Sequence, residues 1–314
     1  YWTHADDEIQ LRVGLWRPTK SSNGTIFVFP GRTEYIEKYG PTIAGLAEHG
    51  YTSFVIDWRG HGLSDRVSRD PKVSHVDHFS DYQRDVAAMV SKADALALPK
   101  PWYLLGHSMG ALIGLRALIE GLPVNAWTFT APLWGIPLSP IERYAAWPLT
   151  WLAQAAGRGQ AYAPGNKAQE GQCYVLSVEF EGNRLTNDPA KFQYMVDQAK
   201  ALPTMQIAAP SMGWVFQALN ECRRLSAIDA PDIPGFVFCG DQDVVVDLAA
   251  IEDRMGRWRK GQFERIANAR HDLLSEVPEV RDRIMEKVYL TFEAADTLVR
   301  GSDNRISKVD DRLP

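Results

Sequence analysis

Short apolar runs alternate with helical patterns through residues 1–135, and no other feature of the sequence constrains the fold as much. Four runs have the length and composition of buried strands: 25–29, 52–58, 102–106 and 126–131. Three segments between them place apolar residues at helical spacing: 38–49, 79–96 and 108–120. Strands that are apolar throughout and alternate with helices predict an α/β fold, with a mostly parallel sheet flanked by helices.

The alternation stops after residue 135 and starts again near residue 229. Residues 136–228 carry helical patterns and no convincing strand, and a segment of this length lies within the usual size of a domain. We therefore predict an α/β core in two parts, 1–135 and 229–300, which is interrupted by a helical cap insertion at 136–228.

The second part of the core resumes the pattern of the first. Strands are predicted at 235–239 and 262–266, followed by a helix at about 278–299. The inner face of this helix has an apolar stripe at helical spacing: Val280, Ile284, Val288 and Phe292. Residues 301–314 are polar and predict a frayed tail.

The segment LLGHSMGAL places Ser108 between a predicted strand and a predicted helix. Gly106 and Gly110 lie two residues before and after the serine, which is the Gly-x-Ser-x-Gly pattern of a nucleophile elbow. A serine on so sharp a turn takes a strained backbone, and the glycines let the strand and the helix pack without Cβ clashes. Taken alone, the pattern also fits a plain glycine-rich turn.

Candidate partners of Ser108 follow it in the order acid, then histidine. The segment FVFCGDQDVVVD is a strand that ends in a cluster of acids, and His271 lies in the loop before the last helix. Serine needs a base to attack a carbonyl, and histidine needs a carboxylate that fixes its tautomer. Asp243 fits the acid best, with Asp241 as the alternative. Asp241 directly follows the turn glycine, and Asp247 lies nearer the next helix.

Composition narrows the function classes. The net charge is −5 and the 34 Lys and Arg residues are scattered, which argues against a nucleic-acid partner. The three cysteines (Cys173, Cys222 and Cys239) are widely spaced, so we expect no metal site and no disulfide framework and favour a reducing compartment. No stretch reaches the roughly 20 apolar residues of a spanning helix, and no dinucleotide fingerprint implies a cofactor. Because the first residue is not Met, the sequence leaves open whether a leader has been removed.

The insertion and its flanks are rich in aromatic residues, among them Trp134, Tyr144, Trp147, Trp151 and Trp214. Most of them are expected to form the core of the helical layer. An alternative is that some, such as Trp134 and Trp214, line an apolar tunnel over the serine and bind the substrate. Others could form an exposed face that rests on a membrane surface.

These motifs carry a family likeness. The chain resembles α/β-hydrolases of the monoglyceride lipase group, and within that group the bacterial lysophospholipase branch. The likeness covers nearly the whole chain through FPGRTEYIEKY, VIDWRGHGLSDR, LLGHSMGA, APLWGI, LTNDPAKF, PSMGWV, CGDQDVVVD and NARHDLLSE. It implies a nucleophile, an acid and a base, which are Ser108, Asp243 and His271. It also implies an oxyanion hole made by the backbone amides of Arg32 and Met109.

The turn Pro30-Gly31-Arg32 departs from the family pattern, because monoglyceride lipases commonly have His-Gly where this chain has Pro-Gly. Ala111 also replaces a frequent second glycine after the elbow. The turn is no nucleotide phosphate loop, since it lacks further glycines and a Gly-Lys-Ser/Thr ending. For the side chain of Arg32 we consider two interpretations: it pairs with Glu34 or another nearby acid, or it binds the phosphate of a lysophospholipid head group.

The expected function is that of a serine hydrolase that cleaves carboxylic esters of lipids, above all lysophospholipids or monoacylglycerols, through an acyl-enzyme. The alternatives are a small-ester carboxylesterase, an acyltransferase, and a ligand-binding protein on a hydrolase scaffold. We expect neither cofactor nor metal, and no nucleic-acid partner. The expected location is the cytoplasm, with peripheral contact of the cap at the inner face of the membrane as a further possibility.

Overall fold

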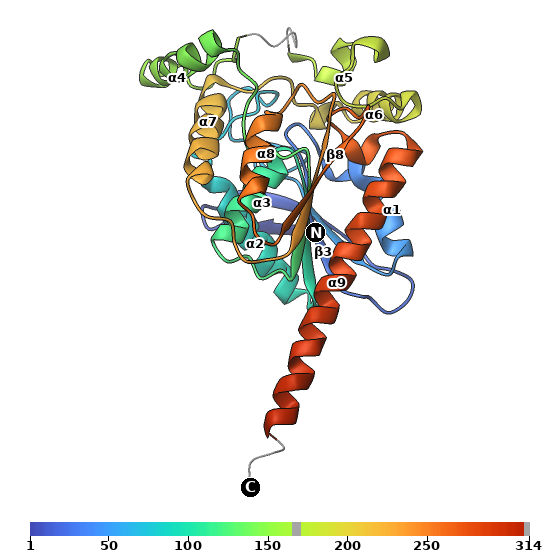
Figure 1. The fold of residues 1–314 in the computed structure, drawn as a ribbon. Helices are drawn as coiled ribbons and strands as arrows, with labels where there is room; N and C mark the ends of the chain where they lie inside the picture. The colour runs from blue at the N-terminus through green and yellow to red at the C-terminus, as the bar shows by residue number, and fades with distance from the viewer. Residues whose placement is uncertain (165–170, 311–314) are drawn as a thin grey trace.

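The computed structural model describes residues 1–164 and 171–310 (Figure 1). Eight strands form one sheet in the order β1-β2-β4-β3-β5-β6-β7-β8. Their bounds are β1 (Trp2–His4), β2 (Gln10–Trp16), β3 (Thr25–Phe29), β4 (Thr52–Ile56), β5 (Trp102–His107), β6 (Ala126–Thr130), β7 (Gly235–Gly240) and β8 (Gly261–Ile266). All pairings from β4 through β3 to β8 are parallel. The predicted mostly parallel sheet is confirmed.

The two N-terminal strands were absent from the sequence-based prediction. β1 and β2 pair antiparallel with each other, and β2 pairs antiparallel with β4, with Val13 opposite Ile56. Buried and half-buried residues alternate along β2, as in a strand near a sheet edge with one face toward solvent. Such a strand has no continuous apolar run, and the other strands were predicted from runs of that kind.

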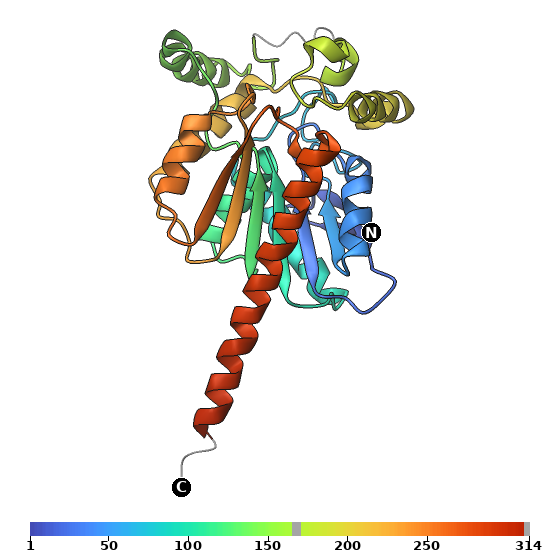
Figure 2. The ribbon, with the colours of Figure 1, turned by 45° about the vertical axis from the view of Figure 1, so that its right-hand side comes forward.

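The helices of the core cover both faces of the sheet. They are α1 (Gly40–Glu48), preceded by the 3₁₀ turn η1 (Ile36–Tyr39), α2 (Asp81–Ala95), α3 (Met109–Ile119), α7 (Met212–Ser226), α8 (Leu248–Gly256) and α9 (Pro278–Asp310). Side chains of β3 point alternately to the two faces, so Phe27 and Phe29 pack with α2, α3, α7 and α8 while Ile26 and Val28 pack with α1 and α9. Figure 2 shows α9 running across its face of the sheet.

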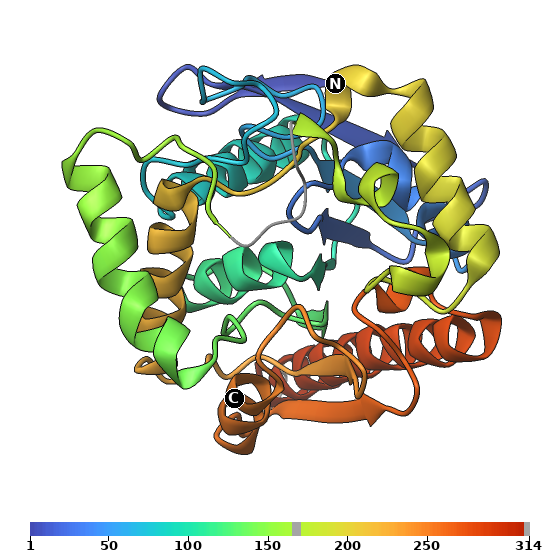
Figure 3. The same cartoon turned by 90° about the horizontal axis from the view of Figure 1, so that it is seen from above.

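A helical cap lies over one end of the sheet (Figure 1), and the view from above shows α4 and α6 on opposite sides of it (Figure 3). It contains α4 (Pro140–Ala155), α5 (Tyr174–Ser177), η3 (Phe180–Gly182), α6 (Pro189–Ala201) and η4 (Pro203–Met205). α6 begins at Pro189, because the carboxylate of Asp188 accepts the amides of Ala190 and Lys191. Among the described residues, no strand of the sheet lies between β6 and β7.

The position of α7 bears on where the cap ends. Trp214, Ala218, Cys222 and Leu225 of α7 are buried in the same apolar cluster as α3 and the sheet. α7 therefore packs on the core, although it lies at the C-terminal end of the segment that the sequence assigns to the cap. The division of the chain at residue 228 stays a prediction.

The prediction that the last helix ends near residue 299 is wrong, because α9 continues to Asp310. Ile284, Val288 and Phe292 are fully buried against the sheet and anchor the helix, as expected. Residues 301–310 contain no proline, and extending an existing helix costs far less than starting one. Polar composition alone therefore did not predict where the helix ends. Residues 311–314 of the predicted tail lie outside the part of the chain that the structure describes.

Candidate active site

Ser108 occupies the turn between β5 and α3. Its backbone has φ 51° and ψ −115°, a conformation that favours glycine. Gly110 allows this turn, since a Cβ there would overlap the carbonyl oxygens of Phe29 and Pro30 at the end of β3. A Cβ at Gly106 would lie 2.9 Å from the ring of Phe129. Both glycines are thus required by packing, as the sequence pattern predicts.

The structure brings His271 and Asp243 to this serine. His271 lies in the loop between β8 and the 3₁₀ turn η5 (Leu273–Ser275). Its Nε2 lies 3.0 Å from Oγ of Ser108, and its Nδ1 lies 2.7 Å from Oδ2 of Asp243. The three side chains are buried, with at most 7% of any residue exposed. The carboxylate accepts a hydrogen bond from Nδ1–H, which leaves the Nε2 lone pair free to accept from the serine hydroxyl.

Asp243 is held by its own loop after β7. Its Oδ1 accepts the amides of Val245 and Val246 at 2.7 and 3.2 Å. Burial opposes ionisation, but the charge and hydrogen bond of His271 and these two amides keep the pKa of Asp243 below its ordinary value. Of the other candidate acids, Asp241 is exposed and Asp247 caps α8. Asp243 is therefore the carboxylate that is ionised beside the imidazole.

The turn Pro30-Gly31-Arg32 lies against the start of α3, because Gly110 packs on the carbonyls that end β3. Trp58 fixes the turn by donating its indole N–H to the carbonyl of Pro30 at 2.9 Å. Met109 provides the first amide of α3, which has no partner within the helix. The end of β3 and the start of α3 thus meet beside Ser108, and an oxyanion hole formed by the amides of Arg32 and Met109 stays a prediction.

A buried group of charges, which sequence reasoning missed, connects this turn to the histidine loop. Glu34 accepts the amide of Gly31 at 2.5 Å and the hydroxyl of Tyr39 at 2.6 Å, and it forms a very short ion pair with Lys38. Lys38 also lies 2.7 Å from Asp272, the neighbour of His271 in the chain. The i,i+4 spacing of Glu34 and Lys38 in the sequence indicates their ion pair, but no local sequence pattern indicates the contact of Lys38 with Asp272.

These charges shift one another's pKa values. Burial alone would raise the pKa of Glu34, yet the positive charge of Lys38, with help from His107, lowers it to about 2. Burial would likewise lower the pKa of Lys38, but Asp272 and Glu34 raise it above its ordinary value. Both groups are therefore charged at neutral pH. The stability that Glu34 contributes is complete above its ordinary pKa and is lost as the pH falls toward 2.

Arg32 does not pair with Glu34, so that interpretation is wrong. Glu34 is occupied by Lys38, and the guanidinium of Arg32 instead lies over the ring of Trp214, 5.4 Å from its centroid. The structure thus brings Trp214 beside the turn. The cation–π contact orients the arginine, but it supplies no counter-charge.

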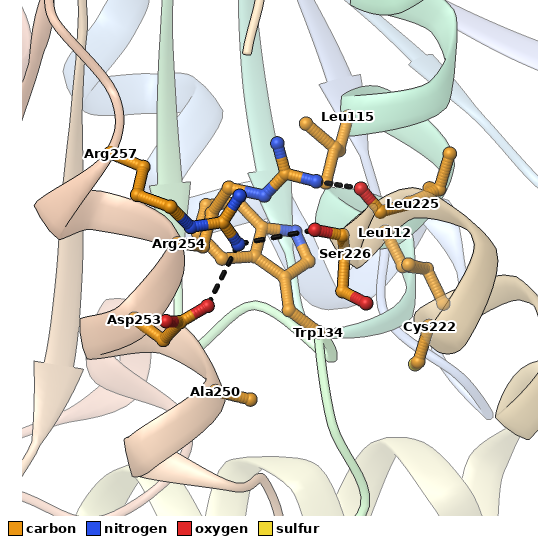
Figure 4. Close-up of a pocket in the computed structure, with 10 residues that line it drawn as sticks. All are labelled: Leu112, Leu115, Trp134, Cys222, Leu225, Ser226, Ala250, Asp253, Arg254 and Arg257. Atoms are coloured by element: carbon orange, nitrogen blue, oxygen red, sulfur yellow. Dashed lines mark hydrogen bonds and ion pairs between the residues drawn. The ribbon is translucent and has the colours of Figure 1, made fainter. Parts of the chain in front are cut away.

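Trp134, the other predicted substrate-binding aromatic, faces a small cavity. Its ring lines a cavity of about 50 Å³ between α3, α7 and α8, together with Leu112, Leu115, Cys222, Leu225, Ser226, Ala250, Asp253, Arg254 and Arg257 (Figure 4). Arg254 closes the cavity by donating to the carbonyls of Leu225 and Ile228. Neither Ser108 nor His271 lines this space, and substrate binding by Trp134 stays a prediction.

Residues 1–164 and 171–310 contain no cluster of three or more His, Cys, Asp or Glu side chains that could hold a metal ion. No described helix is long and apolar enough to cross a bilayer. The three cysteines are free and buried.

Replacing Lys38 with Met should destabilise the protein by about 3–5 kcal/mol at pH 7, because two buried carboxylates lose their cation. The loss should shrink at lower pH, where one carboxyl takes up a proton. Urea unfolding at several pH values measures it, with Lys38→Arg as the charge-conserving control. A pH-independent loss equal in both variants would show that the charges do not matter.

Replacing Ser108 with Gly should give a protein about 1 kcal/mol more stable than Ser108→Ala, because only glycine relaxes the backbone at φ 51°. Both variants lose the same hydroxyl, so their difference in thermal unfolding isolates the backbone. At an unstrained position the alanine variant is the more stable of the two. If Ser108→Ala were more stable than Ser108→Gly, the backbone strain at this position would be contradicted.

Comparison with known proteins identifies the family of the chain. The model of the family described as serine aminopeptidase, S33, matches residues 20–278. A probable lysophospholipase L2 of Haemophilus influenzae is 27% identical over 277 residues, which are 87% of this chain and 85% of that protein. A monoglyceride lipase homolog of Monkeypox virus is 26% identical over 285 residues, or 90% of this chain and 94% of that protein.

Among solved structures, a soluble variant of monoglyceride lipase from Saccharomyces cerevisiae in complex with a substrate analog is similar with a TM-score of 0.70. The identity is 20%, and the match covers 93% of this chain and 94% of that one. This likeness confirms the predicted α/β-hydrolase fold, and the relatives confirm the resemblance seen in the motifs. Since the family model matches most of its length, the chain belongs to the serine aminopeptidase S33 family of hydrolases.

Proposed function

We propose that this chain is a serine hydrolase that cleaves the carboxylic ester bond of lipids, with lysophospholipids and monoacylglycerols as its substrate classes. The observation that carries the proposal is the buried hydrogen-bond chain from Ser108 through His271 to Asp243. The lysophospholipase and monoglyceride lipase names of its relatives support the choice of lipid esters.

In the first step, Oγ of Ser108 attacks the acyl carbonyl while Nε2 of His271 takes the hydroxyl proton. Asp243 stabilises the imidazolium that forms, and it remains ionised because its pKa is held low. The negative charge that develops on the carbonyl oxygen is met by the amides of Arg32 and Met109. A donor of this kind contributes about 3–4 kcal/mol to the transition state in related chemistry.

The tetrahedral intermediate then collapses and the bond to the alcohol breaks. His271 gives its proton to the leaving oxygen, and the acyl group stays on Ser108 as an ester. Water attacks this ester by the same route, with His271 as its base, and releases the fatty acid. Glu34, Lys38 and Asp272 hold the turn and the histidine loop in position without touching the substrate.

The rival activities differ in the acyl acceptor or in the size of the ester. A carboxylesterase with the same three side chains would prefer short acyl chains, and an acyltransferase would pass the acyl group to an added alcohol. A binding protein on this scaffold would not react at its serine. A series of p-nitrophenyl esters, product analysis with an added alcohol, and labelling by a fluorophosphonate separate the three.

The decisive assay measures fatty acid released from lysophosphatidylcholine, lysophosphatidylethanolamine and monoacylglycerol. Ser108→Ala should lower the rate by at least about 10³-fold, because it removes the nucleophile. Asp243→Asn should lower it by a similar factor, since the imidazole takes the wrong tautomer. Asp241→Asn is the matched control and should leave the rate nearly unchanged, because Asp241 is exposed. Brisk cleavage of short esters without release from any lipid would reject the proposal.

We infer further that the cap contacts a membrane surface through α4. Its exposed large apolar side chains include Tyr144, Leu149, Trp151 and Leu152, which are 85%, 48%, 49% and 56% exposed. An apolar helix face of this kind suits the interfacial region of a bilayer. The free, buried cysteines support a reducing compartment, and so a cytoplasmic location.

Changing both Trp151 and Leu152 to Glu should abolish sedimentation with phosphatidylcholine vesicles, because two charges would enter the apolar layer. Leu290→Glu on α9 is the control, since Leu290 is also an exposed apolar residue, at 50%. Wild-type protein that stays in the supernatant, or equal loss in the control, would contradict membrane contact through α4.

A further inference from the structure

Arg32 is half-buried, and one end of its guanidinium is buried without a counter-charge. Its Nη1 atom is inaccessible to solvent and has no hydrogen-bond partner in the structure. No described carboxylate forms an ion pair with it, and the neighbouring acid Glu34 is taken by Lys38. Burial lowers the pKa of Arg32 to about 10, which still leaves it charged at neutral pH. A buried cation of this kind is costly unless something anionic completes it.

The surroundings of Arg32 are rich in hydrogen-bond donors. The ring of Trp214 lies under the guanidinium, and Tyr82 on α2 interacts with its charge. The indole N–H of Trp214 and the hydroxyl of Tyr82 are both buried, and the indole N–H interacts with the hydroxyl oxygen. The Nη1 group of Arg32 and the hydroxyl proton of Tyr82 are left without an acceptor within residues 1–164 and 171–310, which points to a ligand that brings acceptor oxygens and negative charge.

His61 lies close enough for Arg32 to influence it. Its Nδ1 is 3.0 Å from the carbonyl of Arg59, to which it donates as the neutral tautomer. Burial, with the charges of Arg66 and Arg32, lowers the pKa of His61 to about 4. His61 is therefore neutral at pH 7. It offers no negative charge to Arg32 and no positive charge to an anionic ligand.

The reach of Arg32 fits the reaction proposed above. In the proposed reaction the amide of Arg32 meets the ester carbonyl oxygen. The side chain of Arg32 extends from there to Trp214 and Tyr82. The path from the amide nitrogen to the guanidinium carbon has as many bonds as the path from the ester carbonyl carbon of a 1-acyl lysophospholipid to its phosphorus. The same residue can therefore meet the oxyanion with its backbone and the phosphate with its side chain.

We propose that Arg32, with Trp214 and Tyr82 beside it, forms a subsite for the phosphate diester of a lysophospholipid head group. A guanidinium offers two parallel N–H donors to two phosphate oxygens, and its stacking on Trp214 orients it beforehand. An uncharged monoacylglycerol would leave the buried charge unmet. This inference rests on the proposed lipid-ester activity and adds the preference for a phosphate-bearing substrate.

The test compares 1-oleoyl lysophosphatidylcholine with 1-oleoylglycerol, which share the acyl chain and the ester. The readout is the ratio of the two kcat/KM values, because any shift of the turn lowers both alike. Arg32→Gln should lower this ratio at least tenfold, and Arg32→Lys should lower it less, since it keeps the charge but loses the fork. Arg69→Gln, which removes one exposed positive charge, is the control and should leave the ratio unchanged. Equal losses on both substrates in Arg32→Gln would overturn the subsite.

A binding measurement keeps the subsite testable if the ester chemistry fails. Calorimetry with wild-type protein uses glycerophosphocholine, inorganic phosphate and glycerol as probes. Glycerophosphocholine should bind to the wild type and at least tenfold more weakly to Arg32→Gln, whereas glycerol should bind to neither. Binding of inorganic phosphate alone, or of glycerophosphocholine equally to both proteins, would overturn the proposal. Lack of activity on every lipid would reject the proposed function while this binding result still decides the subsite.

Discussion

The close approach of Gly110 to the carbonyl end of β3 is the contact on which the arrangement of the site depends. Because no side chain stands between them, the start of α3 rests directly on Phe29 and Pro30. This contact sets the start of α3 at Met109 against the turn after β3 and holds Ser108 in its strained conformation. Histidine and acid then need only be brought to a serine whose position backbone packing has already set.

The buried charges of Glu34, Lys38 and Asp272 extend this order to the histidine loop. Ion pairs of this kind add little net stability, since desolvation offsets their attraction. They do make misplacement costly, because a shift of either loop would leave a charge alone in a dry environment. The turn after β3 and the loop that carries His271 are therefore positioned relative to each other by electrostatics, while the sheet positions each of them by packing.

The sequence predicted best what local pattern determines. Strands buried on both faces are continuous apolar runs, and the glycines around Ser108 follow from sterics, so both were found. The half-exposed β2 and the end of α9 were not, because an alternating pattern is weak and a polar composition does not end a helix. The partners of Glu34 and the place of Trp134 depend on contacts between distant segments. Such contacts leave no mark in a single sequence.

The hydrogen bond between Ser108 and His271 joins positions 163 residues apart, whereas Asp243 and His271 are only 28 apart. Contacts over long stretches of chain form late, since the entropy of closing the intervening loop must be overcome first. The insertion lies inside that loop. A chain that is still being synthesised therefore holds the serine before the histidine that contacts it. During refolding, the return of serine reactivity toward a fluorophosphonate would report that the two parts of the core have come together.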